Sequence, residues 1–287
     1  MKPRIVRKIL LLFLVSSLVL ATVKTASSQQ TSRNWAGYVI NSNGITAISA
    51  SWTVPKIQCQ STGSKEIVSQ AVSVWIGIDG LGTAIPEQVG TYGLCAYGSP
   101  RYFAWEEDPS LASPGAQIVF PEIYYGEHIT ASIAYLGKNQ FRLSIADAQE
   151  GDNRTFTVII SNTARASAEW IVEDPWDTKT GNYISLPTFQ PVTFSDCSAA
   201  VNNVAGSILQ NQASSWSMTD SNGNIIVTPQ GLNQTGTSFE VGTTPVPEFP
   251  TTPLPILIVS LMFVLAALRT SAKAKIPKIF PFSDRTR

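Results

Sequence analysis

Short acidic segments of this 287-residue chain carry the side chains that could do chemistry. Glu169 and Glu173 bracket an apolar stretch, Glu87 and Gln88 follow a proline, and three acids at 106–108 follow the aromatic stretch 102–105. Residues four apart in a strand point to the same face, so Glu169 and Glu173 would share one. A carboxyl group desolvated there has a pKa above its usual ~4.3 and can take up and return a proton. Residue types alone favour the alternative, ordinary solvated acids at strand ends.

The single histidine of the chain narrows the chemistry further. A Ser-His-Asp or Cys-His apparatus would have to use His128, and a zinc site with several histidines cannot be built. His128 alternates with apolar residues along its segment, which indicates a solvent-facing strand position. The formal net charge is zero, with no basic patch or stripe, so we expect no nucleic-acid partner. Proton transfer is therefore best assigned to carboxylates.

The elements that would position these residues are short β-strands. Segments rich in β-branched and aromatic residues recur between turns that contain glycine, proline or asparagine, and the pattern contains no amphipathic helix of useful length. It predicts one all-β domain over residues 29–241, an antiparallel two-sheet β-sandwich of concanavalin A-like or jelly-roll type. The predicted strands lie at 47–54, 72–78, 102–105, 117–120, 129–135, 140–145, 155–160, 169–172, 192–194 and 225–228.

Both ends of the chain differ from this domain. Residues 1–28 run from basic to apolar to small side chains, which predicts a secretory signal peptide, with an uncleaved N-terminal anchor as the alternative. Residues 242–253 form a Pro/Thr-rich spacer before the apolar segment 254–268, predicted to be a transmembrane anchor or sorting segment. The basic tail 269–287 would stay cytoplasmic. We therefore expect an extracellular domain held at the cell surface.

Three cysteines in an exported chain suggest one disulfide and one spare thiol. Cys59 and Cys95 flank the segment 72–88 and are our candidate pair, which would leave Cys197 free. Closing that loop would contribute roughly 4 kcal/mol in the chain-entropy model. A bond from Cys197 to either Cys59 or Cys95 is the alternative.

Six motifs, in order, resemble the glutamic peptidases of the eqolisin family (peptidase family G1). They cover residues 34 to 199, and together they are far more specific than any one alone. The motifs are Asn34-Trp35-Ala36-Gly37-Tyr38-Val39; Trp52-Thr53-Val54-Pro55; Trp75-Ile76-Gly77-Ile78-Asp79-Gly80 with Glu87-Gln88-Val89-Gly90-Thr91; Tyr102-Phe103-Ala104-Trp105 with Glu107; Ala168-Glu169-Trp170-Ile171-Val172-Glu173-Asp174; and Leu186-Pro187-Thr188-Phe189 with Val192-Thr193-Phe194.

The resemblance implies a catalytic pair, Glu173 and Gln88. Glu173 would be the general base that activates water, and Gln88 would stabilise the oxyanion. Trp35, Trp75, Asp79 and Glu107 would line the cleft and bind substrate. The implied activity is an acid endopeptidase that acts outside the cell on polypeptides, as a monomer, with no metal and no organic cofactor.

Two parts of the chain depart from the family pattern. Two bulky residues after the aromatic stretch are replaced by acids and one position is lost, so either Glu106 or Glu107 could fill the family's glutamate position. Residues 201–240 have no strong match and would complete the sandwich or cover its edge. A lectin-like, non-catalytic β-sandwich that binds glycans or peptides is the alternative function, and a surface-layer structural protein is a further one.

A second resemblance concerns the C-terminal segment. Pro247-Glu248-Phe249, the apolar segment and the basic tail follow the order of an archaeal PEF-type sorting signal. This implies that a sortase-like enzyme cuts near the tripeptide. A permanent membrane anchor is the alternative.

Overall fold

The computed structural model describes residues 29–60, 68–83, 86–107 and 116–243, and within these ranges every regular element is a β-strand. The predicted signal peptide, anchor, tail and all but the start of the spacer lie outside the described residues. No helix among the described residues is long and apolar enough to cross a membrane. The strands are β1 (Gln30–Ser32), β2 (Trp35–Asn41), β3 (Ile45–Thr53), β4 (Ile57–Gln58), β5 (Val68–Ile78), β6 (Glu87–Ala96), β7 (Ser99–Glu107), β8 (Ala116–Phe120), β9 (His128–Gly137), β10 (Gln140–Asp147), β11 (Asp152–Ile159), β12 (Ser167–Glu173), β13 (Trp176–Asp177), β14 (Asn182–Tyr183), β15 (Thr188–Phe189), β16 (Val192–Val201), β17 (Val204–Gly206), β18 (Ser214–Thr219), β19 (Ile225–Pro229) and β20 (Phe239–Gly242).

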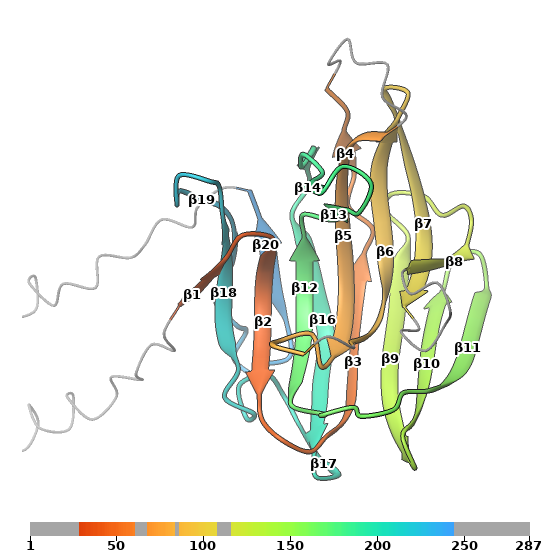
Figure 1. Ribbon diagram of the computed structural model, residues 1–287, viewed down its shortest axis with the longest axis vertical. Helices are drawn as coiled ribbons and strands as arrows, with labels where there is room; N and C mark the ends of the chain where they lie inside the picture. The colour runs from red at the N-terminus through yellow and green to blue at the C-terminus, as the bar shows by residue number, and fades with distance from the viewer. Residues whose placement is uncertain (1–28, 61–67, 84–85, 108–115, 244–287) are drawn as a thin grey trace, which may run out of the picture. The chain divides into compact units, whose positions relative to one another are not determined.

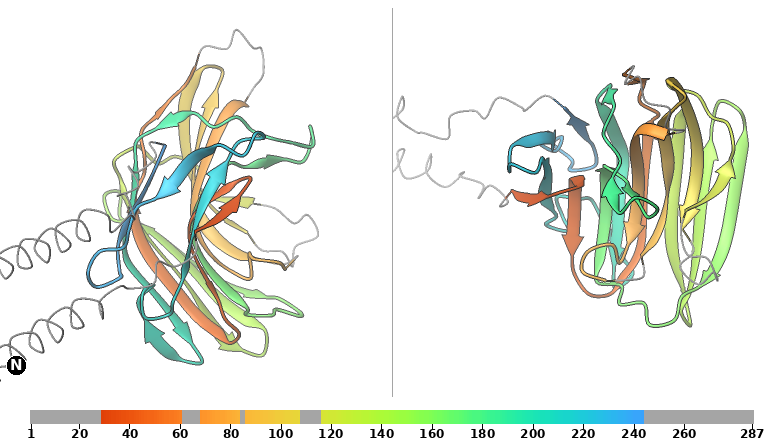
Figure 2. Two further views of the ribbon diagram at one scale, coloured as in Figure 1. Left: turned by 90° about the vertical axis from the view of Figure 1, so that its left-hand side faces the viewer. Right: turned by 45° about the horizontal axis from the view of Figure 1, so that its top comes forward.

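The strands form a sandwich-like arrangement of two layers (Figures 1 and 2). The first layer has the order β18-β2-β12-β5-β6-β7-β8, and the second has the order β11-β10-β9-β3-β16-β20. The prediction of an all-β, antiparallel fold is confirmed, with one refinement. The two layers are not separate sheets, because β19 pairs with both β18 and β20 and makes one 16-stranded sheet that is nearly closed.

The main core lies between the two layers and contains the side chains that alternate strands turn inward. Val74 and Ile76 of β5 belong to it, as do the fully buried Trp52 and Trp170. The two tryptophans also tie one layer to the other through hydrogen bonds. Trp52 Nε1 donates to Thr91 Oγ1 (2.9 Å), and Trp170 Nε1 donates to the Ser49 carbonyl oxygen (3.0 Å). Buried indole N–H groups need such partners, so these bonds fix how the layers face each other.

The first layer is also apolar on its outer face, the face turned away from the second layer. A separate cluster of Val39, Trp75, Trp105 and Ile171 covers it, and Trp35, Tyr92, Phe103 and Trp216 pack against this cluster. Strand β12 is buried on both faces, from Ser167 to Val172. A strand between two apolar surfaces has a continuous rather than an alternating apolar pattern.

The C-terminal region without a family match completes the sandwich. Strand β18 pairs antiparallel with β2 at one end of the first layer, and β20 pairs antiparallel with β16 in the second. Ser217 and Thr228 share a buried hydroxyl–hydroxyl bond of 2.7 Å between β18 and β19. Residues 201–240 are therefore part of the sheet rather than a cover on its edge.

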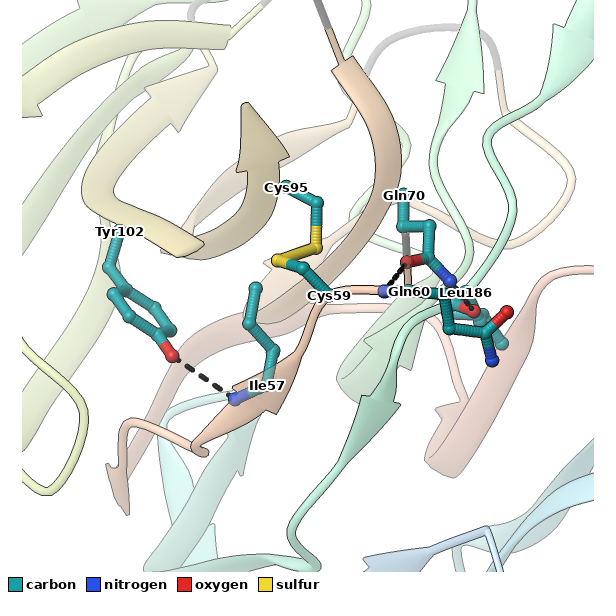
Figure 3. The surroundings of a disulfide bond; sticks show 7 residues. All are labelled: Ile57, Cys59, Gln60, Gln70, Cys95, Tyr102 and Leu186. Atoms are coloured by element: carbon teal, nitrogen blue, oxygen red, sulfur yellow. Dashed lines mark hydrogen bonds between the residues drawn. A yellow bond between two sulfur atoms is a disulfide. The ribbon is translucent and has the colours of Figure 1, made fainter. Parts of the chain in front are cut away.

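A disulfide joins Cys59 to Cys95, near the end of β6 (Figure 3). Cys197 is a buried free thiol. Polar bonds on both sides hold the segment that contains Cys59. Gln70 Oε1 accepts a bond from the Gln60 N–H (2.7 Å), and Tyr102 Oη accepts one from the Ile57 N–H (3.1 Å). The bridge thus pins the region after β3 to the strand that carries Gln88.

Candidate active site

Strand register brings Gln88 and Glu173 to one face of the first layer. Gln88 of β6 lies opposite Gly77 of β5, and Glu173 of β12 lies opposite Ser73 of β5. Residues 73 and 77 are four apart and face the same way, and residues directly opposite each other share a face. Trp75 lies between them on β5 and belongs to the outer cluster. Both members of the expected pair therefore lie on the outer face.

Three N–H groups hold the Glu173 carboxylate. Trp75 Nε1 donates to Oε2 at 2.7 Å, while Trp35 Nε1 and Asn34 Nδ2 donate to Oε1 at 3.1 and 2.9 Å. Both tryptophans were expected at the site. Asn34 was not, although it begins the first family motif, and a single polar residue before a strand gave no separate signal. Fixed donors on both oxygens leave the carboxylate little freedom to turn.

The pKa of Glu173 is raised from 4.5 to about 7. Burial is the largest cause, because it penalises the charged form, and the nearby Glu107 carboxyl raises the pKa further. The three N–H donors act in the opposite direction, since they favour the carboxylate. A group with this pKa exchanges a proton near neutral pH, which suits general base and acid catalysis.

Glu107 occupies the position next to Gln88. It lies directly opposite Gln88 in the pairing of β6 with β7, so the two side chains share the outer face. Glu106 lies opposite Val89, a member of the inner core. Strand alternation thus places Glu107, not Glu106, beside the pair. Burial raises the pKa of Glu107 above its ordinary value.

The Trp75 ring lies between the two members of the pair. Its Nε1 is bonded to Glu173, and its Cζ3 is 2.8 Å from the point where a Cβ on Gly77 would lie. The Gln88 Cγ is 3.1 Å from the same point. Trp35 packs edge-on against Trp75, with 5.2 Å between ring centroids. The Gln88 side-chain amide itself makes no hydrogen bond within the described ranges.

A family model described as the Peptidase A4 family matches residues 33–240. The chain belongs to the Peptidase A4 family. This membership confirms the resemblance to the eqolisin glutamic peptidases and the class of enzyme that it implied.

Known relatives of this Peptidase A4 member include fungal peptidases. Aspergillopepsin-2 of Aspergillus niger is 28% identical over 193 residues, which is 60% of this chain and 66% of that protein. The match thus spans just under two thirds of the relative's length. A crystal structure of scytalido-glutamic peptidase with a transition state analog inhibitor shares the fold, with 21% identity and a TM-score of 0.60 over 74% of this chain and 98% of that one. Aspergilloglutamic peptidase from Aspergillus niger shares it with 21% identity and a TM-score of 0.52 over 61% of this chain and 99% of that one.

Asp79 of this Peptidase A4 chain, expected to line the cleft, is instead fully buried beneath a loop. Its Oδ2 accepts bonds from Thr163 Oγ1 (2.7 Å) and from the Ala164 and Arg165 N–H groups (2.8 and 2.7 Å). Its Oδ1 accepts the Ala166 N–H (2.7 Å). Asp79 therefore organises the connection into β12, the strand that carries Glu173.

Two further buried acids lie near Asp79. Glu87 and Glu169 are both fully buried, and their pKa values are raised to about 9 and about 8, mainly by burial, with the Asp79 charge contributing to both. Glu169 was expected on the Glu173 face because of its spacing, and the register agrees, since it lies opposite Gly77. The burial of Glu87 was not expected, because nothing in the sequence around this acid indicates it. No group of three or more metal-ligating side chains among the described residues could hold a metal ion.

Proposed function

We propose that this chain is an endopeptidase in which Glu173 is the general base and Gln88 is the oxyanion donor. The observation that carries the proposal is the arrangement on the outer face. Glu173 has a raised pKa and is held by Trp75, Trp35 and Asn34, while the Gln88 amide lies on the same face without a partner in the described ranges. A positioned base and an unengaged donor are what peptide hydrolysis by water requires.

The reaction would use one proton and one water molecule. Ionised Glu173 takes a proton from the water as the water oxygen bonds to the scissile carbonyl carbon. The carbonyl oxygen gains negative charge and accepts a hydrogen bond from the Gln88 amide N–H. Protonated Glu173 then gives its proton to the peptide nitrogen as the C–N bond breaks, which releases an amine and a carboxylic acid. Glu173 ends ionised and ready for another cycle.

The proposed substrate is an extended or unfolded polypeptide. The outer face around the pair is aromatic, and Tyr92 and Phe103 stack there with 5.2 Å between ring centroids. Such a surface takes up apolar side chains, whereas a folded protein would not expose a peptide bond to a group on a sheet face. The relatives whose names describe peptidases support the same class of substrate.

We propose that the enzyme is active at mildly acidic to neutral pH. Glu173, with a pKa of about 7, must be ionised to take a proton, and its ionised fraction falls about tenfold for each pH unit below that value. Glu169 and Glu87 keep their protons until about pH 8 and 9. The resemblance implies an acid endopeptidase. We propose that its activity declines toward strongly acidic pH, because Glu173 is then protonated.

Digestion of a denatured protein substrate between pH 2 and 8 tests the proposal. Wild type is compared with Glu173→Gln and Gln88→Ala, and new amino termini are counted. We expect Glu173→Gln to lose nearly all activity, because an amide cannot take the proton from water. Gln88→Ala should lose about 10²–10³ in kcat, the usual effect of losing one oxyanion donor.

Two matched variants at exposed positions, Glu150→Gln and Gln234→Ala, control for the chemical change alone and should keep wild-type activity. Equal activity in all five proteins would overturn the assignment of the pair. A wild type without activity at any pH would favour the lectin-like binding module instead.

We also propose that the domain works outside the cell, anchored to the surface by its C-terminal segment. Support comes from the Cys59–Cys95 disulfide, since such bonds persist in oxidising compartments. Protease treatment of intact cells should remove the domain, and its survival until the cells are lysed would contradict this location. The C-terminal mass of the mature protein separates a cut near Pro247-Glu248-Phe249 from a permanent anchor.

A further inference from the structure

The space above Gly77 is where Gln88 meets a second acidic side chain. A Cβ on Gly77 would lie 3.1 Å from Gln88 Cγ and 3.3 Å from Glu169 Oε2. Gly77 faces both residues in the sheet, because it pairs with Gln88 on β6 and with Glu169 on β12. The absence of a side chain at this position is what brings the two together.

The two oxygens of Glu169 are in different surroundings. Oε1 accepts a bond from the Leu81 N–H at 3.2 Å, which fixes the orientation of the carboxyl group. Oε2 is buried and has no hydrogen-bond partner among the described residues. A buried polar atom without a partner costs about 1–3 kcal/mol, so a nearby polar group is needed.

Donors of Ser167, Gly80 and Leu81 lie beside the Glu169 carboxyl group, but none of them makes a hydrogen bond to Oε2. On its far side, Oε2 is 3.3 Å from where a Cβ on Gly80 would lie, and Trp35 Cη2 is 3.0 Å from the same point. The Trp35 N–H is already donated to Glu173. Gln88 Cγ and Glu169 Oε2 both border the position of a Cβ on Gly77, so the Gln88 side chain brings a further polar group next to Oε2.

We propose that Glu169 is a positioning residue for Gln88, in which the protonated Oε2 donates a hydrogen bond to the Gln88 carbonyl oxygen and turns the amide NH₂ group toward the substrate. Without this hydrogen bond the Gln88 amide could rotate and present its carbonyl oxygen to the oxyanion. The two oxygens would then repel each other. Glu169 keeps its proton throughout the cycle. The inference rests on the proposed role of Gln88.

The surroundings of Glu169 favour its protonated form. Burial is the main cause of its pKa of about 8, and the Asp79 charge adds to it. Glu87, the other acid nearby, also holds its proton up to about pH 9. Bonds from Ser167, Gly80 and Leu81 act in the opposite direction. At neutral pH Glu169 is therefore a hydrogen-bond donor rather than a second anion beside the oxyanion.

A double-mutant cycle tests this role. Glu169→Leu is made in the wild type and in Gln88→Ala, and kcat and KM are measured at pH 6 on a peptide that the wild type cleaves. We expect Glu169→Leu alone to lower kcat about tenfold or more with KM within about twofold, and to cause no further loss in the Gln88→Ala background. Losses that multiply across the two sites would overturn the proposal, since a purely structural role adds to any other change.

The conservative variant Glu169→Gln gives a second, independent readout. Its amide can still donate to Gln88, so it should keep most of kcat, and it has no proton to lose. Wild-type kcat should fall above about pH 8, whereas kcat of Glu169→Gln should stay level there. Identical falls in both proteins would overturn the role even if Glu169→Leu fails to fold.

The two proposals can fail separately. If Gln88→Ala cleaves as well as the wild type, the oxyanion role of Gln88 is wrong, and so is the positioning role of Glu169 that depends on it. If Gln88→Ala is impaired and the Glu169→Leu loss is undiminished in that background, the pair stands and only the positioning role of Glu169 is wrong.

Discussion

Trp75 Nε1 donates a 2.7 Å hydrogen bond to Oε2 of Glu173, and the opposite edge of the same indole lies against the space beside Gln88. One buried ring thus sets both the orientation of the proposed base and its separation from the proposed oxyanion donor. The ring is fully buried and packs against Trp35. It can therefore hold this spacing without a change of rotamer.

Replacing Trp75 by phenylalanine should raise the pKa of Glu173. The indole N–H favours the ionised carboxylate, so its loss makes ionisation harder. The acid side of the kcat–pH profile should move to higher pH, and kcat at pH 5 should fall about tenfold or more. The pH dependence of kcat on a peptide substrate measures this shift.

Trp216→Phe is the matched control, because Trp216 lies on the same outer face and its Nε1 is bonded to Ser214 Oγ (3.2 Å) rather than to Glu173. Its acid limb should coincide with that of the wild type. If the acid side of the kcat–pH profile were the same in Trp75→Phe as in the wild type, the indole hydrogen bond would have no effect on the pKa of Glu173.

Asp79→Asn should reduce the stability of the domain more than it reduces the rate of peptide cleavage. Asp79 accepts four hydrogen bonds from the connection that leads into β12, and an amide retains only one of its two acceptor oxygens. We expect a loss of about 1–3 kcal/mol in the free energy of unfolding, measured in urea. Asp220→Asn is the control, because Asp220 also accepts several bonds, but in an exposed turn. A midpoint for Asp79→Asn no lower than that of Asp220→Asn would contradict the loop-organising role.

The strands that sequence patterns identify best are those rich in β-branched and aromatic residues. Residues 72–78 and 140–145 were predicted as strands, and the structure extends them to β5 and β10. Strand β6, which carries Gln88, was not predicted. Its glycines lower the strand signal, yet packing requires Gly90 and leaves little room for a side chain at Gly93. A Cβ on Gly90 would lie 2.6 Å from Trp75 Cβ, and one on Gly93 would lie 3.3 Å from the Tyr102 ring. Those contacts exist only after the strands have paired.

In the site, too, some features follow from short sequence patterns, and others depend on how distant parts of the chain pack together. The common face of Glu169 and Glu173 follows from the two-residue period of a strand, so spacing alone predicted it. The choice between Glu106 and Glu107 depends on how β6 is aligned with β7, which no local pattern specifies. The burial of Glu87 and Asp79 likewise depends on a loop that folds over them from residues 163–166.

The domain should lose stability as the pH rises from about 5 to 9. Glu169 and Glu87 have folded pKa values of about 8 and 9, above their ordinary 4.5, and Glu173 and Asp174 reach about 7. The folded state thus binds more protons than the unfolded state in this range. The stabilisation is fully present below pH 4.5 and is lost as the pH rises through the folded values. Urea midpoints measured from pH 5 to 9 should fall steadily.

Removing the buried ionisable groups should flatten that dependence. Glu87→Gln and Glu169→Gln should each reduce the fall in midpoint between pH 7 and 9, because a neutral amide releases no proton. Glu150→Gln, at an exposed position, should follow the wild type. A wild type as stable at pH 9 as at pH 5 would be inconsistent with these buried, protonated acids.

Gly77→Ala should impair catalysis more than folding. The new Cβ would lie 2.8 Å from Trp75 Cζ3 and 3.1 Å from Gln88 Cγ, so the side chains that set the site must move, while no backbone atom is among its nearest contacts. We expect kcat to fall about tenfold or more, with a stability loss of about 1–3 kcal/mol, as for other overpacked sites. Gly231→Ala, where a Cβ meets nothing within 4 Å, should leave both unchanged. Gly90→Ala should instead unfold the domain at lower urea than Gly77→Ala, because its Cβ would meet the backbone of β5. If Gly77→Ala kept full kcat, the close packing of Trp75, Gln88 and Glu169 around this position would have no part in catalysis.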